Sequence, residues 1–355
     1  MTYVAGAPLS DQAERMAAWT DKVARGNTLL YTRLGDATSK DADLLAMLSE
    51  IPQQQPVPLL LFGAVHQLLL NGAQHPLREF YATCTDTPDP VSDPFPAFKE
   101  FVMDNYDAIV EIAATRQVQT NEVARSSLFL PAYRIIARRT NRPMWIIEVG
   151  SSAGLTLLFD RWHYTYHHGH SSVEIGDPES PVRLECIVRG PQRPLFPDPM
   201  PDIAARIGVD LDPIDINNPD DESWIRGLVW PDRPDRHKRL SAAISVAKAH
   251  PLTLVEGDAI DCLEEQVGAA SDDSVVVINH SHVLNQLPAE RREDFTVELD
   301  RLSQDRPIWR ISNEWLTHSN PQLDLIRHFG NSHQIEGLAD VHHHGEWISW
   351  RGPTR

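Results

Sequence analysis

The segment Met144–Asp160, MWIIEVGSSAGLTLLFD, changes from strand to turn to helix chemistry within a few residues. Trp145–Val149 is an apolar, β-branched run typical of a strand that is buried on both faces of a parallel sheet. Gly150–Gly154 has turn chemistry, and the apolar residues of Leu155–Asp160 predict a helix. The unit therefore predicts an α/β fold in which a ligand lies at a helix N-terminus.

The loop of this unit favours a nucleoside cofactor. Glu148-x-Gly150-x-Ser152-x-Gly154 resembles the first motif of class I S-adenosylmethionine-dependent methyltransferases, acidic-x-Gly-x-Gly-x-Gly, with Ser152 in place of the middle glycine. Glycines in such a loop let the backbone approach a ligand closely. The residues predicted to contact the cofactor here are Glu148, Gly150, Ser151, Ser152 and Gly154.

Two other chemistries and one packing explanation compete for the same loop. A dinucleotide fingerprint, G-x-G-x-x-G, is disfavoured because Gly150 and Gly154 are four apart with no third glycine. Gly150-Ser151-Ser152-Ala153-Gly154 does match G-x-S-x-G, the nucleophile elbow of serine hydrolases. The loop also fits a tight turn whose glycines serve only packing.

Composition restricts the class of partner. The chain of 355 residues has 50 acidic and 32 basic residues, a formal net charge of -18, which disfavours nucleic acids and anionic membranes. Three separated cysteines, Cys84, Cys186 and Cys262, predict neither a disulfide framework nor a zinc-thiolate site. The N-terminus lacks the pattern of a signal peptide. We expect a cytoplasmic protein that acts on a small molecule.

Residues 1–138 predict a helical domain, because apolar residues recur at helical spacing between breaks that contain proline. No strands or oxyanion loop precede Ser152, which weakens the hydrolase interpretation. Asn121 and Arg125 lie one turn apart near the end of this region. They fit either helix capping with a surface ion pair or, as we predict, the wall of a substrate pocket.

Several blocks of the chain together resemble one known family. They are TNEVARSSLFLPAY, EVGSSAGLTLLFDRWHYTY, DPESPVRLECIVRG, GVDLDPIDI, WIRGLVWPD and VEGDAIDCL. The chain resembles an uncharacterised family, catalogued as a domain of unknown function, whose fold is assigned to the methyltransferase-like Rossmann group. The resemblance implies that fold and S-adenosylmethionine as the cofactor, but no substrate. The histidines between His163 and His170 depart from the family, which has tyrosine and arginine there.

The acid that would hold the cofactor's ribose follows the second strand of such a fold. A carboxylate suits this role because it is an acceptor of hydrogen bonds only. Apolar residues of Ile207–Asp212 end in acids, so Asp210 or Asp212 is the candidate. This requires an insertion around 163–204, and Glu174 and Glu185 within it stay as competitors.

Polar residues follow the next three predicted strands. Asp258 and Ala259 come after Leu252–Val255, where an acid and a backbone N–H would recognise adenine. The strand-like run Ser274–Asn279 ends in Asn279, His280 and Ser281, which are the predicted catalytic residues, with His280 as a base that titrates near neutrality. Glu314, after the strand Pro307–Ile311, is predicted to line the substrate pocket.

The C-terminal runs Gln334–Asp340 and Glu346–Arg351 predict a hairpin that closes the sheet edge. Histidines cluster at His342–His344 and between His163 and His170, and such clusters can bind metal. They lack the i, i+4 spacing of a zincin and a nearby cysteine, so we predict no metal site.

The combined prediction is a Rossmann-like class I methyltransferase sheet, mostly parallel with an antiparallel C-terminal hairpin, in residues 139–355. A helical cap formed by residues 1–138 would cover the carboxyl ends of its strands, where ligands bind in open α/β sheets. The predicted activity is methyl transfer from S-adenosylmethionine to an unknown small molecule. A non-catalytic binding protein with the same fold is the first alternative, a serine hydrolase the second, and the oligomeric state is undetermined.

Overall fold

The computed structural model describes residues 9–196, 198–316 and 318–354. The chain divides into two compact units. The first holds the described residues up to Thr120 together with Asn217–Lys238, and the second holds Asn121–Ile216 and the residues from Arg239 onward. That the helical region caps the sheet stays a prediction.

The first unit is helical, and its central helix is α4 (Val57–Leu70). The sequence VPLLLFGAVHQLLL has no charged residue, and a helix that is apolar on all sides is buried. A glycine pair lets α4 approach α8 closely, because a Cβ on Gly227 would lie 2.8 Å from the carbonyl oxygen of Gly63. The elements of this unit are α1 (Leu9–Trp19), η1 (Thr20–Ala24), α2 (Leu29–Thr38), α3 (Ala42–Leu48), α4, η2 (Pro76–Phe80), α5 (Phe95–Asp104), α6 (Tyr106–Thr115), α8 (Pro219–Gly227) and the start of α9 (Pro234–Ala249).

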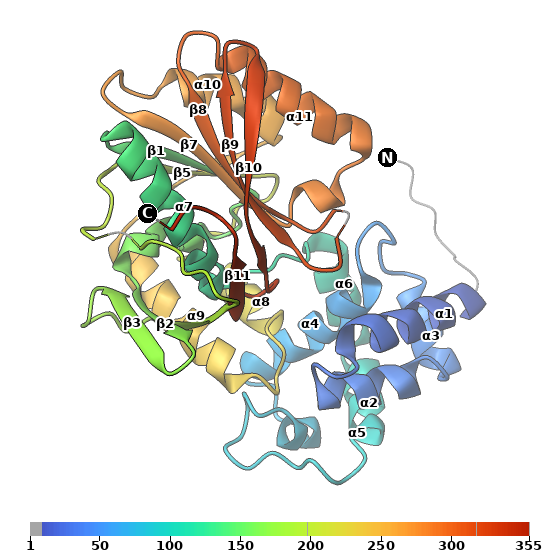
Figure 1. Ribbon diagram of the computed structural model, residues 1–355. Coiled ribbons are helices and arrows are strands. Elements are labelled where there is room, and N and C mark those ends of the chain that lie inside the picture. The colour runs from blue at the N-terminus through green and yellow to red at the C-terminus, as the bar shows by residue number, and fades with distance from the viewer. Residues whose placement is uncertain (1–8, 197, 317, 355) are drawn as a thin grey trace. The chain divides into compact units, whose positions relative to one another are not determined.

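The second unit is built on an eleven-stranded mixed sheet with the order β3-β2-β4-β11-β10-β9-β8-β7-β1-β5-β6 (Figure 1). Its strands are β1 (Met144–Val149), β2 (His163–His168), β3 (Ser171–Gly176), β4 (Arg183–Arg189), β5 (Ile203–Asp210), β6 (Thr253–Glu256), β7 (Val275–Ser281), β8 (Ile308–Glu314), β9 (Gln322–Phe329), β10 (Ser332–Val341) and β11 (Trp347–Trp350).

The strands β6-β5-β1-β7-β8 form a continuous parallel block. From β1 the chain moves to β5 and β6 on one side, and then returns to β7 and β8 on the other. The strand order therefore reverses between β1 and β7. In open α/β sheets, the crevice outside the carboxyl ends at such a switch point is where ligands bind.

The remainder of the sheet differs from the prediction. β10 and β11 do form the predicted antiparallel hairpin, but it does not close the sheet edge. β10 pairs with β9, a strand the sequence did not predict, and β11 pairs in parallel with β4. The predicted insertion supplies β2, β3 and β4, which extend the sheet beyond the hairpin.

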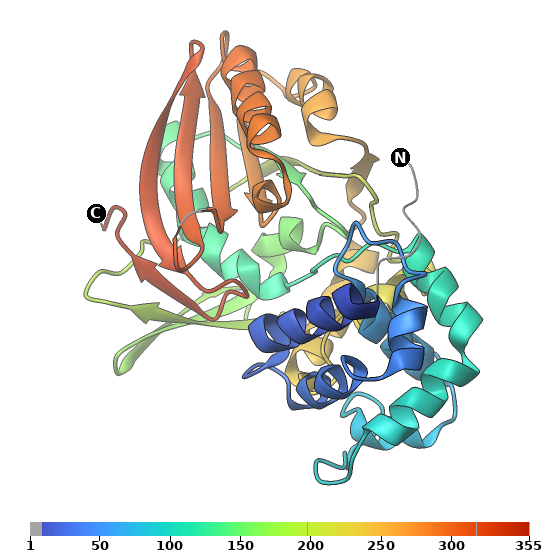
Figure 2. The same cartoon turned by 90° about the vertical axis from the view of Figure 1, so that its right-hand side faces the viewer.

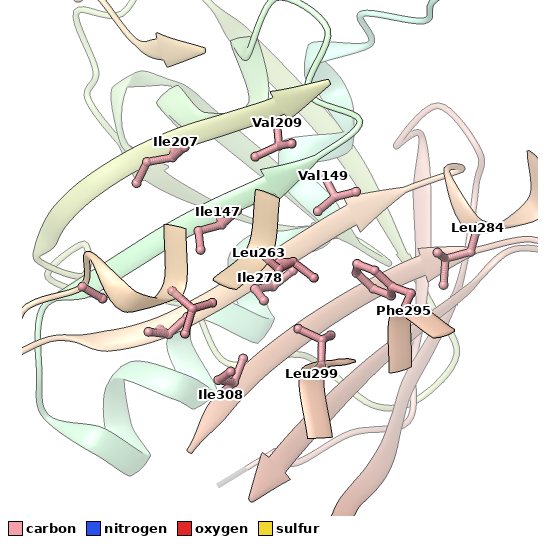
Figure 3. Close-up of a cluster of buried hydrophobic side chains, with 13 residues drawn as sticks. Ile147, Val149, Ile207, Val209, Leu263, Ile278, Leu284, Phe295, Leu299 and Ile308 are labelled. Carbon is pink, nitrogen blue, oxygen red and sulfur yellow. The ribbon is translucent and has the colours of Figure 1, made fainter. Parts of the chain in front are cut away.

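Helices cover the parallel block on both faces. α10 (Ala259–Gly268) and α11 (Ala289–Leu302) lie along one face (Figures 1 and 2), where their side chains join alternate strand residues in a buried apolar cluster (Figure 3). α7 (Ser126–Thr140) follows the short η3 (Val123–Arg125) and packs against β8 on the opposite face. We refer to these as the α11 face and the α7 face. No helix among the described residues is both long and apolar enough to span a membrane.

The helix predicted directly after Gly154 is only the short 3-10 segment η4 (Leu155–Arg161). Its four apolar side chains are buried and the chain re-enters the sheet at His163, which leaves no length for a regular helix. The prediction of a regular helix is therefore wrong at this position, whereas the binding of a ligand beside it stays a prediction. A further short helical segment of this unit is η5 (Leu284–Gln286), after β7.

Candidate functional site

Polar side chains at the carboxyl ends of β1, β7 and β8 separate into two buried clusters, one on each face of the sheet. Side chains alternate between faces along a strand. Ile147, Val149 and Ile278 join the cluster on the α11 face, so Glu148 and Asn279 point to the α7 face. β7 continues to Ser281, which places the side chain of His280 on the α11 face.

This alternation corrects one part of the predicted site. Asn279, His280 and Ser281 were expected to act together in one loop. They belong to a strand instead, and His280 lies on the opposite face from its two neighbours. Glu314 lies with His280 on the α11 face. On the α7 face, Asn313 Nδ2 donates a hydrogen bond to the Ser281 hydroxyl at 3.0 Å.

Glu148 is the centre of the α7-face cluster. The residue is buried, with 4% of its surface exposed. Oε1 accepts hydrogen bonds from the hydroxyl of Thr156 and from Nδ2 of Asn279, the latter at 3.2 Å. Oε2 has no hydrogen-bond partner among the described residues, and neither does Oδ1 of Asn279. Two adjacent buried acceptors are therefore left without a donor from the chain.

The protonation of Glu148 follows from its surroundings. Burial raises the pKa of this carboxyl to about 7, although hydrogen bonds from Thr156 and Asn279 oppose the shift. The negative charge of Asp210 adds to the rise, and the guanidinium of Arg125 acts against it. A carboxyl with such a pKa can gain or lose a proton near neutrality, a property common at functional sites.

The loop from Gly150 to Gly154 uses all of its backbone N–H groups within the fold. Gly150 and Ser151 donate to the carbonyl of Val209, and Gly154 donates to that of Ser151. The remaining two N–H groups meet side chains: that of Ser152 donates to Oδ2 of Asp210 at 2.7 Å, and that of Ala153 donates to Oδ1 of Asn121 at 3.2 Å. A pyrophosphate would find no free backbone donor in this loop, and that the loop does not bind a dinucleotide stays a prediction.

The glycines of the loop have packing reasons of their own. Gly150 and Gly154 both have positive φ, 70° and 67°. A Cβ on Gly150 would lie 2.3 Å from a methyl group of Val283, and one on Gly154 would lie 2.9 Å from Leu252. The need for glycine at positions 150 and 154 therefore has an explanation that involves no ligand. The packing explanation therefore accounts for these two predicted cofactor residues, and their contact with a cofactor stays a prediction.

Asp210 ends β5 beside β1, where the ribose acid was predicted. Its two oxygens accept from Ser152 N and Asp212 N, and burial raises its pKa. Each carboxylate oxygen has a second lone pair, so Asp210 can still accept other donors. Glu174 and Glu185 are wrong as competitors, because β3 and β4 lie at the far part of the sheet from β1.

The predicted adenine site has a structural explanation in this geometry. Asp258 is the N-cap of α10, accepting from Ile260 N at 2.9 Å, and it forms a half-exposed ion pair with Arg291 at 2.8 Å. Ala259 is the first residue of that helix. Helix capping and this ion pair are enough to explain an aspartate at position 258 at the start of a helix, without a bound adenine.

The α11-face cluster is a buried chain of three side chains. Arg310 Nε donates to His280 Nε2 at 3.0 Å, and His280 Nδ1 lies 2.7 Å from Glu314 Oε1. An arginine only donates, so Nε2 is the acceptor and Nδ1–H is the donor to the carboxylate. Burial lowers the pKa of His280, with Arg310 adding to the effect and Glu314 opposing it.

His280 is thus a neutral, fully buried imidazole with both nitrogens engaged. A general base needs a nitrogen within reach of the proton that it removes. The predicted role of His280 as base is not supported by this geometry, which favours a structural role. Glu314 was predicted to line the substrate pocket, but its oxygens also accept from the backbone of Val283 and Asn285 at 3.0 and 3.2 Å, which favours a structural role for this residue too.

The predicted pocket residues Asn121 and Arg125 do lie near the α7-face cluster. Asn121 Nδ2 donates to the Ser152 hydroxyl at 2.8 Å, so its amide fixes the loop on both sides. Arg125 is mostly buried, and its Nε donates to the carbonyl of His343 at 2.9 Å. Its charge acts on Glu148 and on His282.

Two side chains of this cluster were missed from the sequence. His282 has a φ of 57°, and its Nε2 has no hydrogen-bond partner among the described residues. Burial lowers its pKa to about 3. The buried hydroxyl of Tyr133, on α7, is close enough to Glu148 to feel its charge. His282 was visible as the end of an N-H-S-H run, but nothing in the sequence distinguishes Tyr133 from a core residue.

A cavity of about 650 Å³ in this unit lies away from the α7-face cluster. Residues at the amino ends of β1, β5 and β6 line it, among them Trp145, Ala205 and Thr253. None of the predicted site residues belongs to it. The α7-face cluster is therefore defined by its buried polar atoms and not by this cavity.

Replacing Glu148 with glutamine is expected to change how stability depends on pH. A carboxyl whose pKa rises on folding stabilises the fold below its unfolded pKa, and this contribution is lost as pH rises through about 7. Glutamine keeps the acceptor oxygen without the charge. The variant should match the wild type at a pH of about 4.5 and exceed its unfolding free energy by about 3 kcal/mol at a pH of about 8.

Thermal unfolding across this pH range measures the difference between the two proteins. Glu336→Gln, on an exposed strand residue paired with Arg139, is the control and should leave the profile unchanged. Parallel profiles for wild type and Glu148→Gln would mean that Glu148 is ionised and compensated in the folded state.

Comparison with known proteins agrees with the resemblance seen in the sequence. No curated protein and no solved structure matches the chain significantly. A family model, described as "Uncharacterized protein conserved in bacteria (DUF2332)", matches residues 13–350, nearly the whole chain. The protein therefore belongs to this uncharacterised bacterial family, and its described fold is α/β with a large, mostly parallel sheet.

Proposed function

We propose that the protein binds S-adenosylmethionine at the α7-face cluster and transfers its methyl group to a small polar molecule. The observation that carries the proposal is Glu148: a buried carboxyl with a pKa near 7 and an oxygen without a donor, beside the equally unpartnered Oδ1 of Asn279. Buried acceptors of this kind are normally satisfied, so their position calls for a donor supplied by a ligand.

The position of these atoms supports a nucleoside ligand. Glu148 and Asn279 face each other at the carboxyl ends of β1 and β7, on either side of the point where the strand order reverses. The order of the parallel block corresponds to the 3-2-1-4-5 arrangement of doubly wound sheets, in which that crevice holds the cofactor. Asp210 ends the adjacent strand on the other side of β1.

The charges and donors of the cluster favour S-adenosylmethionine over a phosphate-bearing cofactor. The loop has no backbone N–H left for a phosphate, whereas its surroundings offer acceptors. Asp210 would accept from the ribose hydroxyls, and Glu148 and Asn279 would accept from the ammonium group of the methionine portion. A cation beside Glu148 also offsets the cost of ionising a buried carboxyl.

The bound cofactor would supply an electrophilic methyl group. The chain would contribute orientation and the exclusion of water, the main contributions of a protein to such a transfer. Glu148 is proposed to be ionised by the ammonium group and to orient the methionine portion, because its Oε2 has no other partner among the described residues. Asn279 positions that carboxyl through its 3.2 Å hydrogen bond.

Two competing functions make different predictions. A binding protein that has lost catalysis would hold the cofactor without turnover. The serine hydrolase interpretation gains one observation, since Ser152 has a positive φ of 51°, as a strained elbow would. Its hydroxyl, however, accepts a hydrogen bond from the amide of Asn121, a group that cannot act as a base.

Proton release measured by calorimetry tests the cofactor site. Titration with S-adenosylmethionine in buffers of different ionisation enthalpy, at a pH of about 7, is expected to show release of a fraction of a proton as the cation ionises Glu148. Glu148→Gln should bind without this release, and Glu336→Gln should behave as the wild type. Absence of binding by S-adenosylmethionine and S-adenosylhomocysteine at millimolar concentration would refute the proposal.

Ser152→Ala separates the methyltransferase from the hydrolase. The variant removes a hydroxyl that accepts one hydrogen bond from Asn121, so cofactor affinity is expected to change by less than about tenfold. Assays of the wild type and the variant with acyl esters provide the contrast. Ester hydrolysis by the wild type that disappears in Ser152→Ala would identify this serine as the nucleophile.

A further inference from the structure

The hairpin of β9 and β10 places two histidines directly opposite each other. Its turn is Gly330-Asn331, with φ of 55° and 62°, the pair of positive values that a tight two-residue hairpin requires. This turn sets the register, in which His328 pairs with His333. Residues so paired have Cβ atoms about 5 Å apart, and the two imidazole centroids are 5.2 Å apart.

A carboxylate from α11 lies between these two rings. Asp300 is in the last turn of α11, and its oxygens lie 2.6 Å from Nδ1 of His328 and 2.9 Å from Nδ1 of His333. The turn is fixed to this helix end because Gly330 N donates to the carbonyl of Ser303 at 3.2 Å. Figure 2 shows α11 running beside these strands. Three separate elements thus hold the three side chains together.

The three groups match the donors that divalent transition metals take. One ligand atom from each of Asp300, His328 and His333 lies within 4.8 Å of the others. Two imidazoles with one carboxylate occur in catalytic zinc sites and in non-haem iron sites, where solvent completes the coordination. His328 is fully buried, whereas His333 is about one-third exposed, so one side of the cluster is open to solvent.

The surrounding charges favour a cation. Arg310 is a buried positive charge on the same face of the sheet, and it acts on His328. Three carboxylates, those of Glu314, Asp324 and Asp300, act on this guanidinium. Among these groups the negative charges outnumber the positive one, which favours a bound divalent ion. His328 Nε2 also has no hydrogen-bond partner among the described residues, so Asp300 is the partner that the structure gives this buried ring.

We infer that Asp300, His328 and His333 form a binding site for a divalent transition metal of the zinc type, which fastens the β9–β10 hairpin to α11. His328 pairs with Ile308, the first residue of β8, so the site lies at the amino ends of the parallel strands. Glu148 lies near their carboxyl ends. The metal site is therefore separate from the proposed cofactor site and does not depend on it.

Zinc titration of the full chain, after treatment with a chelator, tests this site. The wild type is expected to bind one zinc ion saturably and to unfold at a higher temperature when it is bound. His333→Ala and Asp300→Asn should each weaken the affinity by at least about tenfold. Because His333 is partly exposed, its variant should fold; His170→Ala, at an exposed histidine outside the cluster, is the matched control and should bind as the wild type does.

A spectroscopic measurement makes the test specific to the coordination. Cobalt(II) in place of zinc should give visible absorption bands with the wild type and with His170→Ala, and these bands should be lost in His333→Ala. Magnesium, which prefers oxygen ligands, should not compete. Equal zinc affinity in the wild type and His333→Ala, or no saturable zinc binding by the wild type below about 1 mM, would overturn the inference.

Discussion

Glu314→Ala is expected to lower the free energy of unfolding of the second unit by about 3–5 kcal/mol. Glu314 is 4% exposed, and its carboxylate accepts a hydrogen bond from His280 Nδ1–H at 2.7 Å. Without this carboxylate, the guanidinium of Arg310 stays buried and loses the negative charge of Glu314, which raises the pKa of Arg310 more than any other carboxylate does. The backbone N–H groups of Val283 and Asn285 also lose their acceptor.

Hydrogen exchange measured by mass spectrometry locates this effect. Peptides that cover β7 and β8 should exchange faster in Glu314→Ala, and Glu314→Gln should recover part of the protection because its oxygen can still accept. Glu336→Ala removes a carboxylate from an exposed pair with Arg139 and should cost less than about 1 kcal/mol. A loss for Glu314→Ala no larger than that of the control would mean that His280 and Arg310 reach other partners.

The parallel block could be predicted from the sequence because its strands carry continuous apolar runs. Val275–Ile278 and Ile146–Val149 are buried on both faces, and this burial leaves a pattern that no surface strand has. β9 has polar residues at Asp324, Arg327 and His328 among its apolar ones, so it lacked such a run. The position of β9 in the sheet depends on its pairing with β8 and β10. These contacts form only in the folded chain, so a local sequence pattern does not predict them.

The sequence predicted at which strand ends the polar residues lie, but not that these residues separate into two clusters on opposite faces of the sheet. Acidic and amide residues predicted a site at the carboxyl ends of three strands, and the structure places Glu148, Asp210 and Asn279 at or near the ends of β1, β5 and β7. The sequence could not show that β7 continues to Ser281, because buried polar residues in a strand resemble a loop. That one difference moves His280 to the other face. The raised pKa of Glu148 depends on burial and on partners that are distant in the sequence. The residues next to position 148 in the sequence indicate neither of these causes.

The same limit explains the two glycines of the loop. Their spacing suggested a backbone that approaches a cofactor. In the structure, the methyl group of Val283 occupies the space where a side chain at position 150 would lie, and Leu252 is close to that at position 154. A sequence pattern records that a side chain is excluded, but not which atoms exclude it.

Gly150→Ala is expected to lower the free energy of unfolding by about 3 kcal/mol, from about 1 kcal/mol for the positive φ of 70° and about 2 kcal/mol for the contact. The new Cβ would lie 2.3 Å from Val283 Cγ2, and a β-branched side chain has little freedom to rotate away. Gly169→Ala is the matched control: its φ is 60°, and no atom lies within 4 Å of the added carbon, so it should cost only about 1 kcal/mol.

The double variant Gly150→Ala/Val283→Ala distinguishes packing from ligand binding. Removing the methyl groups of Val283 should relieve the clash, so the two substitutions together should cost about 1–2 kcal/mol less than the sum of their separate costs. Denaturant unfolding measures this coupling, and calorimetry with S-adenosylmethionine measures binding by the refolded double variant. Restored stability with restored binding assigns Gly150 to packing alone, whereas restored stability without binding assigns it to the cofactor as well. Additive costs would contradict the contact with Val283.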